Sequence, residues 1–400
     1  MIYTLEHEKA LEKFKTAVAM EFDPTVKQQK LTAPLEALLF FFAEAGRRPH
    51  LAREAAALLL ELQPAAALGA ALQKCLSENW ENRRQFTPLL EALPTCSVLK
   101  KRYYPHMVPI PGGAFDMGSA VDAPDHQSDE TLHRVALSPY QIADTPLTFY
   151  QYALYCEATD ESIAGHSPGW GKFGDHPLVN ISWYEALTYC NWLSAQLLGE
   201  KNACYAITRA RNSDPNNQVN NDYLKWKVEC TPTRPTYRLP TEAEWEFAAR
   251  GGGASIHTVY AGSDNLDEAG WYWKNSRGDG GKQLDGVWQE RVQDILTYCT
   301  THPVKGKKPV KTAGGSEIFD LSGNVYEWCW DWYDAEYYNK CKQQEKPMEC
   351  PIGAESSNAG RVVRGGSWNS GPEYCRVAGR FRDDPDFRFN LIGFRLVFVP

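Results

Sequence analysis

The sequence lacks the features that mark several common classes of protein. It contains no run of about 18 apolar residues, which excludes an ordinary membrane-spanning helix. Its first residues, MIYTLEHEKALEKFKTAV, carry acidic side chains and lack the apolar core of a secretory signal. Basic residues are not in excess, because the net charge is -8 at pH 7. These absences predict a cytoplasmic protein that binds neither nucleic acid nor a membrane.

Cysteine is present, but it lacks the close pairing that metal or redox motifs show. The 11 cysteines are an odd number and include no CxxC pair. In a chain without a secretory signal, this pattern indicates mostly reduced thiols. Two pairs flank irregular segments that a disulfide could close, and the sequence leaves the bridged and free states open for both: Cys204 with Cys230, and Cys341 with Cys350.

Two regions of different composition meet near residue 100. Before it, the chain is rich in Ala, Leu and Glu, with apolar residues at helical spacing. Residues 1–100 contain no nucleotide loop, metal-ligand spacing or catalytic constellation. We therefore expect a small all-helical domain that binds an unknown protein partner, with helices near residues 4–20, 31–45, 51–62, 64–78 and 80–92.

After residue 104, short strand-like runs alternate with turns and a few helices. Ser182 has the character of a helix N-cap. Thr241 precedes Glu244 by three residues, and this capping-box spacing predicts a short helix that ends at the glycines 251–253. The other predicted elements are a β-hairpin over residues 107–119 and helices over residues 146–159 and 179–197.

Six motifs follow one another in this second region. They are VPIPGGAFDMGS, HPLVNISWYEALTYCNWLS, YRLPTEAEWEFAARGG, FDLSGNVYEWCWDWY, RVVRGGSWN and NLIGFRLV. Together they resemble the domain of formylglycine-generating enzymes, the sulfatase-modifying factors, over residues 105–400. The resemblance implies an α+β fold of the C-type-lectin-like kind, with little regular secondary structure. Relatives of this kind include oxidases and binding proteins, so the fold alone does not give the function.

The residues that the enzymes of this family need are incomplete. In its copper oxidases, two cysteines of the closing segment bind the metal, and the resemblance places those positions at Ser370 and Cys375. One thiolate cannot supply the two sulfurs that Cu(I) prefers, so we expect no copper and interpret Cys375 as a core residue. The sulfoxide-forming relatives use histidines of a helical region, and residues 1–100 show no comparable set. A metal-dependent oxidase of either class is the alternative function.

The closing segment, about residues 368–392, resembles instead the variable region of proteins diversified by retroelements. In such regions adenine-containing codons, commonly those of Asn, are randomised between fixed positions. The resemblance implies a non-enzymatic protein whose hypervariable surface binds an unknown protein or other macromolecule. The candidate ligand-binding residues can all arise from an AAC codon by changes at its adenines: Asn369, Ser370, Gly371, Tyr374, Gly379, Phe381, Asp383, Asp384, Phe387, Phe389, Asn390 and Leu391.

The aromatic residues of this segment allow two interpretations. Tyr374, Phe381, Phe387 and Phe389 alternate with Asp and Gly in a turn-rich stretch. Aromatic anchors next to small, adaptable residues are typical of binding surfaces. The alternative is that the three Phe side chains fill the core of a loop. We predict the binding surface.

Arginine dominates the fixed positions of the segment. Seven Arg and no Lys occur between Arg361 and Arg395. A guanidinium group can bind a carboxylate or several carbonyls at once, which an ammonium group does less well. We therefore expect these arginines to hold the irregular backbone. Arg382 is predicted to bind loop carbonyls, and Gly393 is predicted to need a positive φ.

The motif FDLSGNVYEW resembles a calcium loop of the family. The resemblance implies ligands from the side chains of Asp320 and Glu327 and from the carbonyls of Gly323 and Val325. Oxygen ligands from a turn suit Ca²⁺. The turn can also form without a metal, so a structural calcium ion and a metal-free loop are both open.

Overall fold

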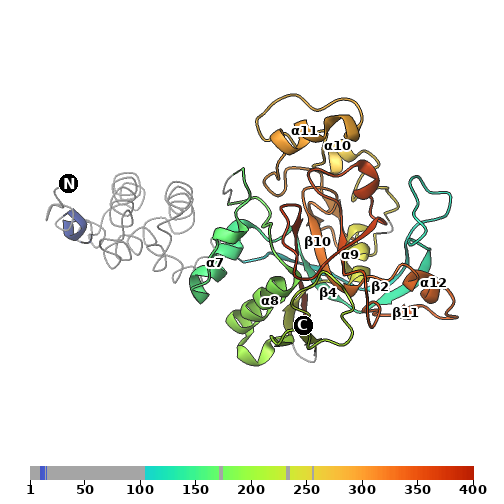
Figure 1. Ribbon diagram of the computed structural model, residues 1–400, viewed down its shortest axis with the longest axis horizontal. Helices are drawn as coiled ribbons and strands as arrows, with labels where there is room; N and C mark the ends of the chain where they lie inside the picture. Colours follow the sequence, from blue (N-terminus) through green and yellow to red (C-terminus); the bar gives the residue numbers. More distant parts are fainter. Residues whose placement is uncertain (1–9, 14, 16–103, 171–173, 231–234, 255) are drawn as a thin grey trace. The chain divides into compact units, whose positions relative to one another are not determined.

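The computed structural model describes residues 10–13, 15, 104–170, 174–230, 235–254 and 256–400. The chain forms two compact units, one of residues 1–104 with 153–162 and one of residues 105–152 with 163–400. The helical domain predicted over residues 1–100 lies almost wholly outside the described residues, which Figure 1 draws in colour. No helix within the described ranges is long and apolar enough to cross a membrane.

The larger unit is built around small, mostly antiparallel sheets. The first has the strand order β1 (Met107–Ile110), β4 (Tyr140–Ala143), β15 (Val397–Val399) and β7 (Thr236–Arg238). The second has the order β13 (Arg380–Asp383), β12 (Arg361–Arg364), β10 (Tyr326–Trp332) and β14 (Ile392–Gly393). A third sheet has the order β11 (Met348–Glu349), β3 (His133–Leu137) and β2 (Gly113–Met117). The other two sheets pair β5 (Tyr205–Thr208) with β6 (Lys227–Cys230) and β8 (Val310–Lys311) with β9 (Glu317–Ile318).

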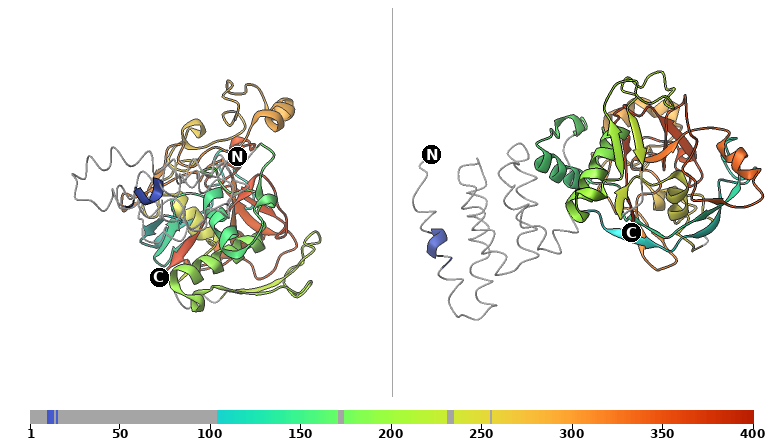
Figure 2. Two further views of the ribbon diagram at one scale, coloured as in Figure 1. Left: turned by 90° about the vertical axis from the view of Figure 1, so that its left-hand side faces the viewer. Right: turned by 90° about the horizontal axis from the view of Figure 1, so that it is seen from below.

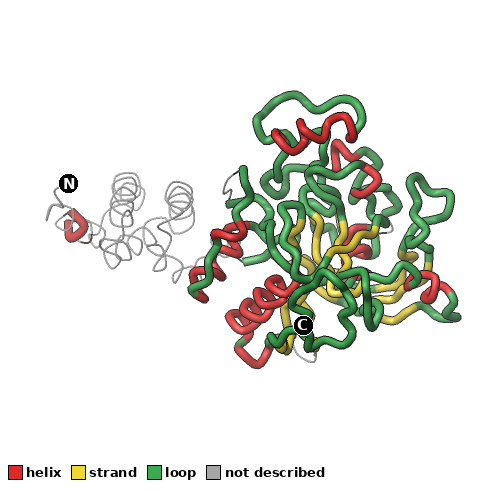
Figure 3. Tube along the Cα trace, in the orientation of Figure 1, coloured by secondary structure: helices red, strands yellow, loops and turns green. Residues whose placement is uncertain are grey.

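Helices and loops connect these sheets, and loops make up much of the unit, as Figure 3 shows in green. This mixture of short helices, small sheets and long loops is the α+β architecture expected from the sequence. The α-helices are α7 (Phe149–Thr159), α8 (Trp183–Leu198), α9 (Glu242–Ala249), α10 (Leu266–Ala269), α11 (Trp288–Tyr298) and α12 (Tyr337–Lys342). Short 3₁₀ helices lie at Ala164–His166, Glu200–Asn202 and Pro372–Tyr374.

Both helix starts predicted from capping residues are confirmed. At α8 the Glu185 amide donates to Ser182 Oγ at 3.3 Å, and Ser182 N donates back to the Glu185 carboxylate at 2.9 Å. At α9 the corresponding distances between Thr241 and Glu244 are 3.2 Å and 2.8 Å. Each pair satisfies amide groups that a helix N-terminus would otherwise leave without a partner.

The β-hairpin predicted over residues 107–119 is wrong. β1 pairs with β4, and β2 pairs with β3, so the two strands belong to different sheets. Gly112 and Gly113, with φ of 74° and 133°, turn the chain from one sheet into the other. A Cβ at residue 112 would lie 2.5 Å from the Leu137 carbonyl oxygen, so the turn requires glycine at this position.

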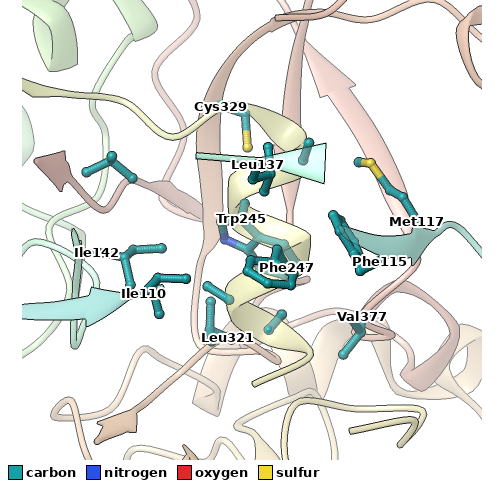
Figure 4. Packing of buried hydrophobic residues seen from close by; sticks show 14 of the residues in the cluster. Ile110, Phe115, Met117, Leu137, Ile142, Trp245, Phe247, Leu321, Cys329 and Val377 are labelled. Carbon is teal, nitrogen blue, oxygen red and sulfur yellow. The ribbon is translucent and has the colours of Figure 1, made fainter. Parts of the chain in front are cut away.

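The hydrophobic core surrounds α9. In Figure 4, Trp245 and Phe247 of this helix lie between Ile110 and Ile142 on one side and Phe115 and Met117 on the other. The whole helix is buried, including three glutamates. A fully buried carboxylate is stable only when it is paired. Partners for two of these glutamates come from the closing segment and the strand before it.

Candidate ligand-binding surface

The closing segment enters and leaves the second sheet. It follows β12, passes through the 3₁₀ helix Pro372–Tyr374, forms the edge strand β13 and returns to β14. In β13, Phe381 lies opposite Val363 and Asp383 lies opposite Arg361. Side chains alternate along a strand, so Phe381 and Asp383 share one face and Arg380 and Arg382 share the other.

The four aromatic residues singled out in the sequence lie at the surface. The exposed fractions of their side chains are 48% for Tyr374, 42% for Phe381, 43% for Phe387 and 42% for Phe389. They contact one another edge-on or tilted, with ring centroids 6.3 Å apart for Tyr374 and Phe381 and 5.5 Å apart for Phe387 and Phe389. The alternative in which the phenylalanines fill a loop core does not fit this exposure.

The other predicted ligand-binding residues are less exposed than the four aromatic residues. Asn369, Asp383, Asp384 and Asn390 are half-buried, whereas Ser370, Gly371, Gly379 and Leu391 are buried. Ser370 is held inward because its Oγ accepts from Ser367 N at 3.0 Å and contacts Ser367 Oγ at 3.0 Å. A Cβ at residue 371 would lie 2.4 Å from the Glu373 carboxylate, so a larger side chain there requires the Glu373 side chain to move.

A cavity of about 390 Å³ opens among these residues, and we call it the aromatic cavity. Eight of the predicted ligand-binding residues line it: Asn369, Ser370, Gly371, Tyr374, Phe381, Asp383, Phe389 and Leu391. Gly379 lines a neighbouring cavity with Tyr374 and Phe381. Asp384, Phe387 and Asn390 are not part of the aromatic cavity wall. The segment therefore combines a cavity with an adjoining aromatic surface.

The wall of the aromatic cavity also contains residues that sequence reasoning missed. Trp288 and Gln289, at the start of α11, complete one side, and Tyr326 lies beneath Phe381 with ring centroids 5.5 Å apart. Trp288 Nε1 donates to the Asn369 carbonyl at 2.7 Å, which ties α11 to the closing segment. Figure 1 and the left view of Figure 2 show α11, in orange, at the periphery of the unit. The available signal in the sequence was a large aromatic residue, Trp288, between the motifs YRLPTEAEWEFAARGG and FDLSGNVYEWCWDWY.

Buried arginines anchor the segment from below, beginning with Arg364. Its side chain is fully buried and donates to Glu242 at 2.7 Å, to Glu246 at 2.6 Å and to the Val377 carbonyl at 2.7 Å. Both glutamates come from α9. One guanidinium group thus joins β12, the core helix and the loop after Cys375.

Two further arginines make paired contacts of the same kind. Arg376 binds both oxygens of Glu130, at 2.8 Å and 2.6 Å, and donates to the Glu373 carbonyl at 3.0 Å. Arg380 binds both oxygens of Glu242, at 2.7 Å and 2.9 Å. Burial raises the pKa of Glu242, but Arg380 and Arg364 outweigh this effect and hold it at about 2. With Arg364 and Arg395, these residues form what we call the arginine framework.

Arg395 closes the framework next to the first sheet. Its guanidinium binds both oxygens of Glu327, at 2.6 Å and 2.7 Å, and the carbonyls of Ala143 and Phe319 at 3.0 Å and 2.9 Å. Arg361 is buried differently, with its guanidinium 3.8 Å and 3.5 Å from the ring centres of Trp183 and Trp332. Burial lowers the pKa of Arg361 to about 9.

Two predictions about the fixed positions need correction. Arg382 is exposed, and its guanidinium lies 4.7 Å from the ring centre of Tyr333; no bond from it to a carbonyl occurs among the described residues. Strand alternation turns Arg382 away from the face that bears Phe381. Gly393 does not have a positive φ. It is needed for space, because a Cβ there would lie 2.5 Å from the Leu178 carbonyl oxygen.

Cys375 is a core residue, as predicted. Its side chain is fully buried, burial raises the pKa of the thiol, and the nearby Glu373 raises it further. A Cβ on Gly366 would lie 2.6 Å from Cys375 Sγ, so the sulfur is closely packed. The other copper-binding position implied by the resemblance falls on Ser370, whose hydroxyl is bonded to Ser367. The donor atoms present do not fit a two-sulfur copper site.

The predicted calcium loop has its oxygens engaged elsewhere. Glu327 binds Arg395 with both carboxylate oxygens and accepts from Trp245 Nε1 at 2.7 Å. Asp320 accepts from Lys305 N at 2.8 Å and from Asn324 Nδ2 at 3.2 Å. The Gly323 carbonyl accepts from Val325 N at 2.9 Å. No group of three or more acidic, His or Cys side chains within the described ranges could hold a metal. These contacts do not fit a calcium ion unless Arg395 moves.

The two cysteine pairs behave differently. Cys204 directly precedes β5, and Cys230 ends β6 opposite Tyr205, so their Sγ atoms lie 3.1 Å apart as free thiols. A bridge would bring the sulfurs closer by about 1 Å. Cys350 is exposed and its sulfur contacts Ser138 Oγ at 3.5 Å, while Cys341 is buried. The structure thus brings the sulfurs of the first pair close together as free thiols, one of the two states that the sequence left open.

Known proteins share both the sequence motifs and the fold of this chain. The model of the sulfatase-modifying factor enzyme 1-like domain matches residues 95–399. The chain belongs to this family. The formylglycine-generating enzyme of Streptomyces coelicolor is 32% identical over 310 residues, which cover 72% of this chain and 87% of that protein. Chaperone protein LppX of Paenibacillus barcinonensis is 32% identical over 278 residues, covering 69% and 83%.

A solved structure adds a third kind of relative. Treponema denticola variable protein 1 is 30% identical, with a TM-score of 0.52, and the match covers 74% of this chain and 95% of that one. The similar proteins thus include an enzyme, a chaperone and a variable protein by name. Family membership confirms the expected fold, and the residues of this chain must decide its activity.

Proposed function

We propose that the chain is a non-enzymatic ligand-binding protein. Residues 368–392 present a hypervariable surface, diversified by a retroelement, that binds a protein or other macromolecule. The observation that carries this proposal is the exposure of Tyr374, Phe381, Phe387 and Phe389 around a cavity on a rigidly anchored backbone. Exposed aromatic patches of this kind are typical of interaction sites.

The contacts that anchor the segment beneath its surface also support the proposal. Every member of the arginine framework binds a carboxylate that lies outside residues 368–392, in α9, in β10 or at Glu130. The backbone of the segment is therefore held by contacts that do not involve the exposed side chains. Such an arrangement tolerates substitution at the surface positions, which is what diversification requires.

The alternative, a metal-dependent oxidase, has the support of the formylglycine-generating relatives but not of the donor atoms. Ser370 stands where a second thiolate is needed, and Cys375 is buried with a raised pKa. The similarity to a variable protein, at 30% identity, agrees with the binding function. The proposal also includes a cytoplasmic location and a protein partner for residues 1–100.

A stability experiment tests whether the surface is independent of the fold. We expect a variant with Tyr374, Phe381, Phe387 and Phe389 all replaced by Ser to stay folded, because exposed substitutions change the free energy of unfolding by about 0.5 kcal/mol each. If the four rings formed a core, each truncation would cost about 3 to 5 kcal/mol and the variant would not fold. Thermal denaturation followed by circular dichroism distinguishes these outcomes.

A selection experiment tests the binding role directly. We expect a displayed library, randomised at the four aromatic positions and at Asp383 and Asp384, to yield binders to lysozyme that keep the thermal stability of the parent. A matched library at Val362, Val363, Arg364 and Arg380 should yield few folded proteins. Failure of the first library to yield any folded binder would contradict the proposal, as would oxidation of a cysteine peptide by the purified protein that Cys375→Ala abolishes.

A further inference from the structure

The aromatic cavity has an unbalanced set of charges. Two of the residues that line it, Glu373 and Asp383, carry carboxylates. None of the lining residues is Lys, Arg or His, although the surrounding segment is rich in arginine. Arg376 and Arg380 are absent from the wall because they are buried in the framework, whereas the exposed Arg388 binds Glu185. The cavity wall is therefore acidic, although the four Arg residues of the segment balance its four acidic residues.

Asp383 is the lining carboxylate that belongs to a strand, β13. Strand alternation places it on the same face as Phe381, away from Arg380 and Arg382. Its Oδ1 accepts from the Asp384 amide at 2.9 Å, and it forms no ion pair with any described residue. Burial raises its pKa to about 6, and the nearby Asp384 adds to the effect. A half-buried carboxylate without a cationic partner gains stability when a ligand supplies one.

Aromatic rings form the rest of the wall. Five residues contribute them: Trp288, Tyr326, Tyr374, Phe381 and Phe389. The face of an aromatic ring carries partial negative charge and attracts a cation within about 6 Å of the ring centre. Rings and carboxylates together therefore favour a flat or compact cation that also has an apolar stem. Arg and Lys side chains have both parts.

We propose that the aromatic cavity binds a basic side chain of the ligand, the guanidinium of Arg or the ammonium of Lys, with Asp383 as its counter-charge. The inference rests on the proposed function and names the chemistry that this surface selects. Glu373 is a second negative group at the rim, and Trp288 supplies a ring from outside the closing segment. Charge specificity then depends on Asp383, a position within the variable segment, so other versions of the surface would select other ligands.

Short peptides test the inference without a known partner. The probes are acetyl-Gly-X-Gly-amide peptides with X as Arg, Lys, citrulline or Glu, titrated into the full chain by ligand-observed NMR. Citrulline has the shape of Arg but no charge. We expect the Arg and Lys peptides to bind at least about fivefold more tightly than the citrulline peptide, which corresponds to roughly 1 kcal/mol. The Glu peptide should bind most weakly.

Two neighbouring carboxylates supply matched variants. Asp383→Asn should remove the preference for Arg over citrulline. Asp386→Asn should leave it unchanged, because Asp386 does not line the cavity and instead accepts a hydrogen bond from Tyr223 N at 2.8 Å. Trp288→Ala should lower the affinity for the Arg peptide by at least about threefold, because the cavity loses one aromatic ring.

The outcomes separate this inference from the proposed function. Equal binding of the Arg and citrulline peptides, preference for the Glu peptide, or no binding of the Arg peptide at about 10 mM would overturn the cationic specificity. The library selection against lysozyme does not depend on that specificity, because it varies Asp383 itself. Binders from the library together with a failed peptide test would therefore reject the basic ligand and retain the binding surface.

Discussion

The arginine framework and the exposed aromatic residues lie close together in the chain, within residues 364–395, but reverse the usual places of charged and apolar side chains. Arg364, Arg376, Arg380 and Arg395 are buried, while Tyr374, Phe381, Phe387 and Phe389 are exposed. Each arginine has a carboxylate partner at hydrogen-bond distance, and this pairing makes its burial tolerable. The aromatic rings have no comparable role in the core. The difference shows that burial of a side chain in this loop depends more on the presence of a hydrogen-bonding partner than on the polarity of the side chain.

This separation also explains how the segment can be both irregular and well defined. Regular strands make up little of residues 365–391, so backbone hydrogen bonding alone does not fix the loop. Guanidinium groups replace it by binding carbonyls and carboxylates together, as Arg376 does with Glu373 and Glu130. The surface side chains stay outside this network.

The largest effect should come from breaking the framework. Arg380→Ala leaves the buried Glu242 carboxylate with one of its two cations, Arg364. Removing one partner of a buried ion pair costs about 3 to 5 kcal/mol. We expect the free energy of unfolding, measured with urea, to fall by that amount or the variant to be unfolded.

Arg382→Ala is the matched control, two residues along the same strand. Arg382 is exposed, so its loss should change the free energy of unfolding by only about 0.5 kcal/mol. Equal destabilisation by the two variants would show that burial does not separate the framework from the surface.

The free energy of unfolding should also depend on pH through the buried cluster of Glu242, Arg364 and Arg380, with a somewhat smaller effect. The pKa of Glu242 is about 2 in the folded chain, below the usual value near 4.3 in an unfolded one. The unfolded state therefore binds more protons between these pH values. The stabilisation is fully present above about pH 4.5 and is lost as pH falls towards 2. Each tenfold difference in proton affinity between the two states corresponds to about 1.4 kcal/mol in the free energy of unfolding.

Glu242→Gln supplies the comparison for that measurement. The difference in free energy of unfolding between the parent and this variant should be greatest at pH 7 and should shrink as pH falls from 4.5 to 2.5. A difference that stays constant over this range would mean that the Glu242 carboxylate is not held in its charged form by Arg380 and Arg364.

The sequence predicted those parts of the fold that depend on neighbouring residues. Thr241 was found because it lies three residues before Glu244, and Ser182 because Ser is a favoured N-cap residue, so both signals are local. The hairpin over residues 107–119 failed because the partners of its strands, β3 and β4, are chosen by the packing of whole sheets. Local turn signals do not carry that information.

The candidate ligand-binding surface could likewise be predicted only where the signal is local in the sequence. The exposed aromatic residues could be predicted from composition and from the resemblance. Trp288 was missed because its contact with Asn369 spans 81 residues of sequence. Arg382 was misassigned because its orientation depends on where β13 begins, and a shift of one residue exchanges the two faces of a strand.

A smaller loss of stability is expected from adding a side chain at Gly393, where the backbone is closely packed. In Gly393→Val, the added Cβ would lie 2.5 Å from the Leu178 carbonyl oxygen, so the backbone of β14 must shift. Overpacking of this kind typically costs about 1 to 3 kcal/mol. Gly169→Ala is the control, because nothing lies within 4 Å of a Cβ at that position and the residue is exposed. A melting temperature of Gly393→Val equal to that of the control would show that the loop adapts to side chains even at its fixed positions.

The smallest effect, no change at all, is expected from metal removal. A calcium ion bound only by the folded state would stabilise it by mass action, so chelation would lower the melting temperature. Here the cation that faces Glu327 is Arg395, which belongs to the chain and cannot be chelated. We expect equal melting temperatures with excess EDTA and with added CaCl₂. A lower melting temperature in EDTA, reversed by calcium and absent in Asp320→Ala, would mean that Arg395 yields the Glu327 oxygens to a metal and that the framework is not built from protein charges alone.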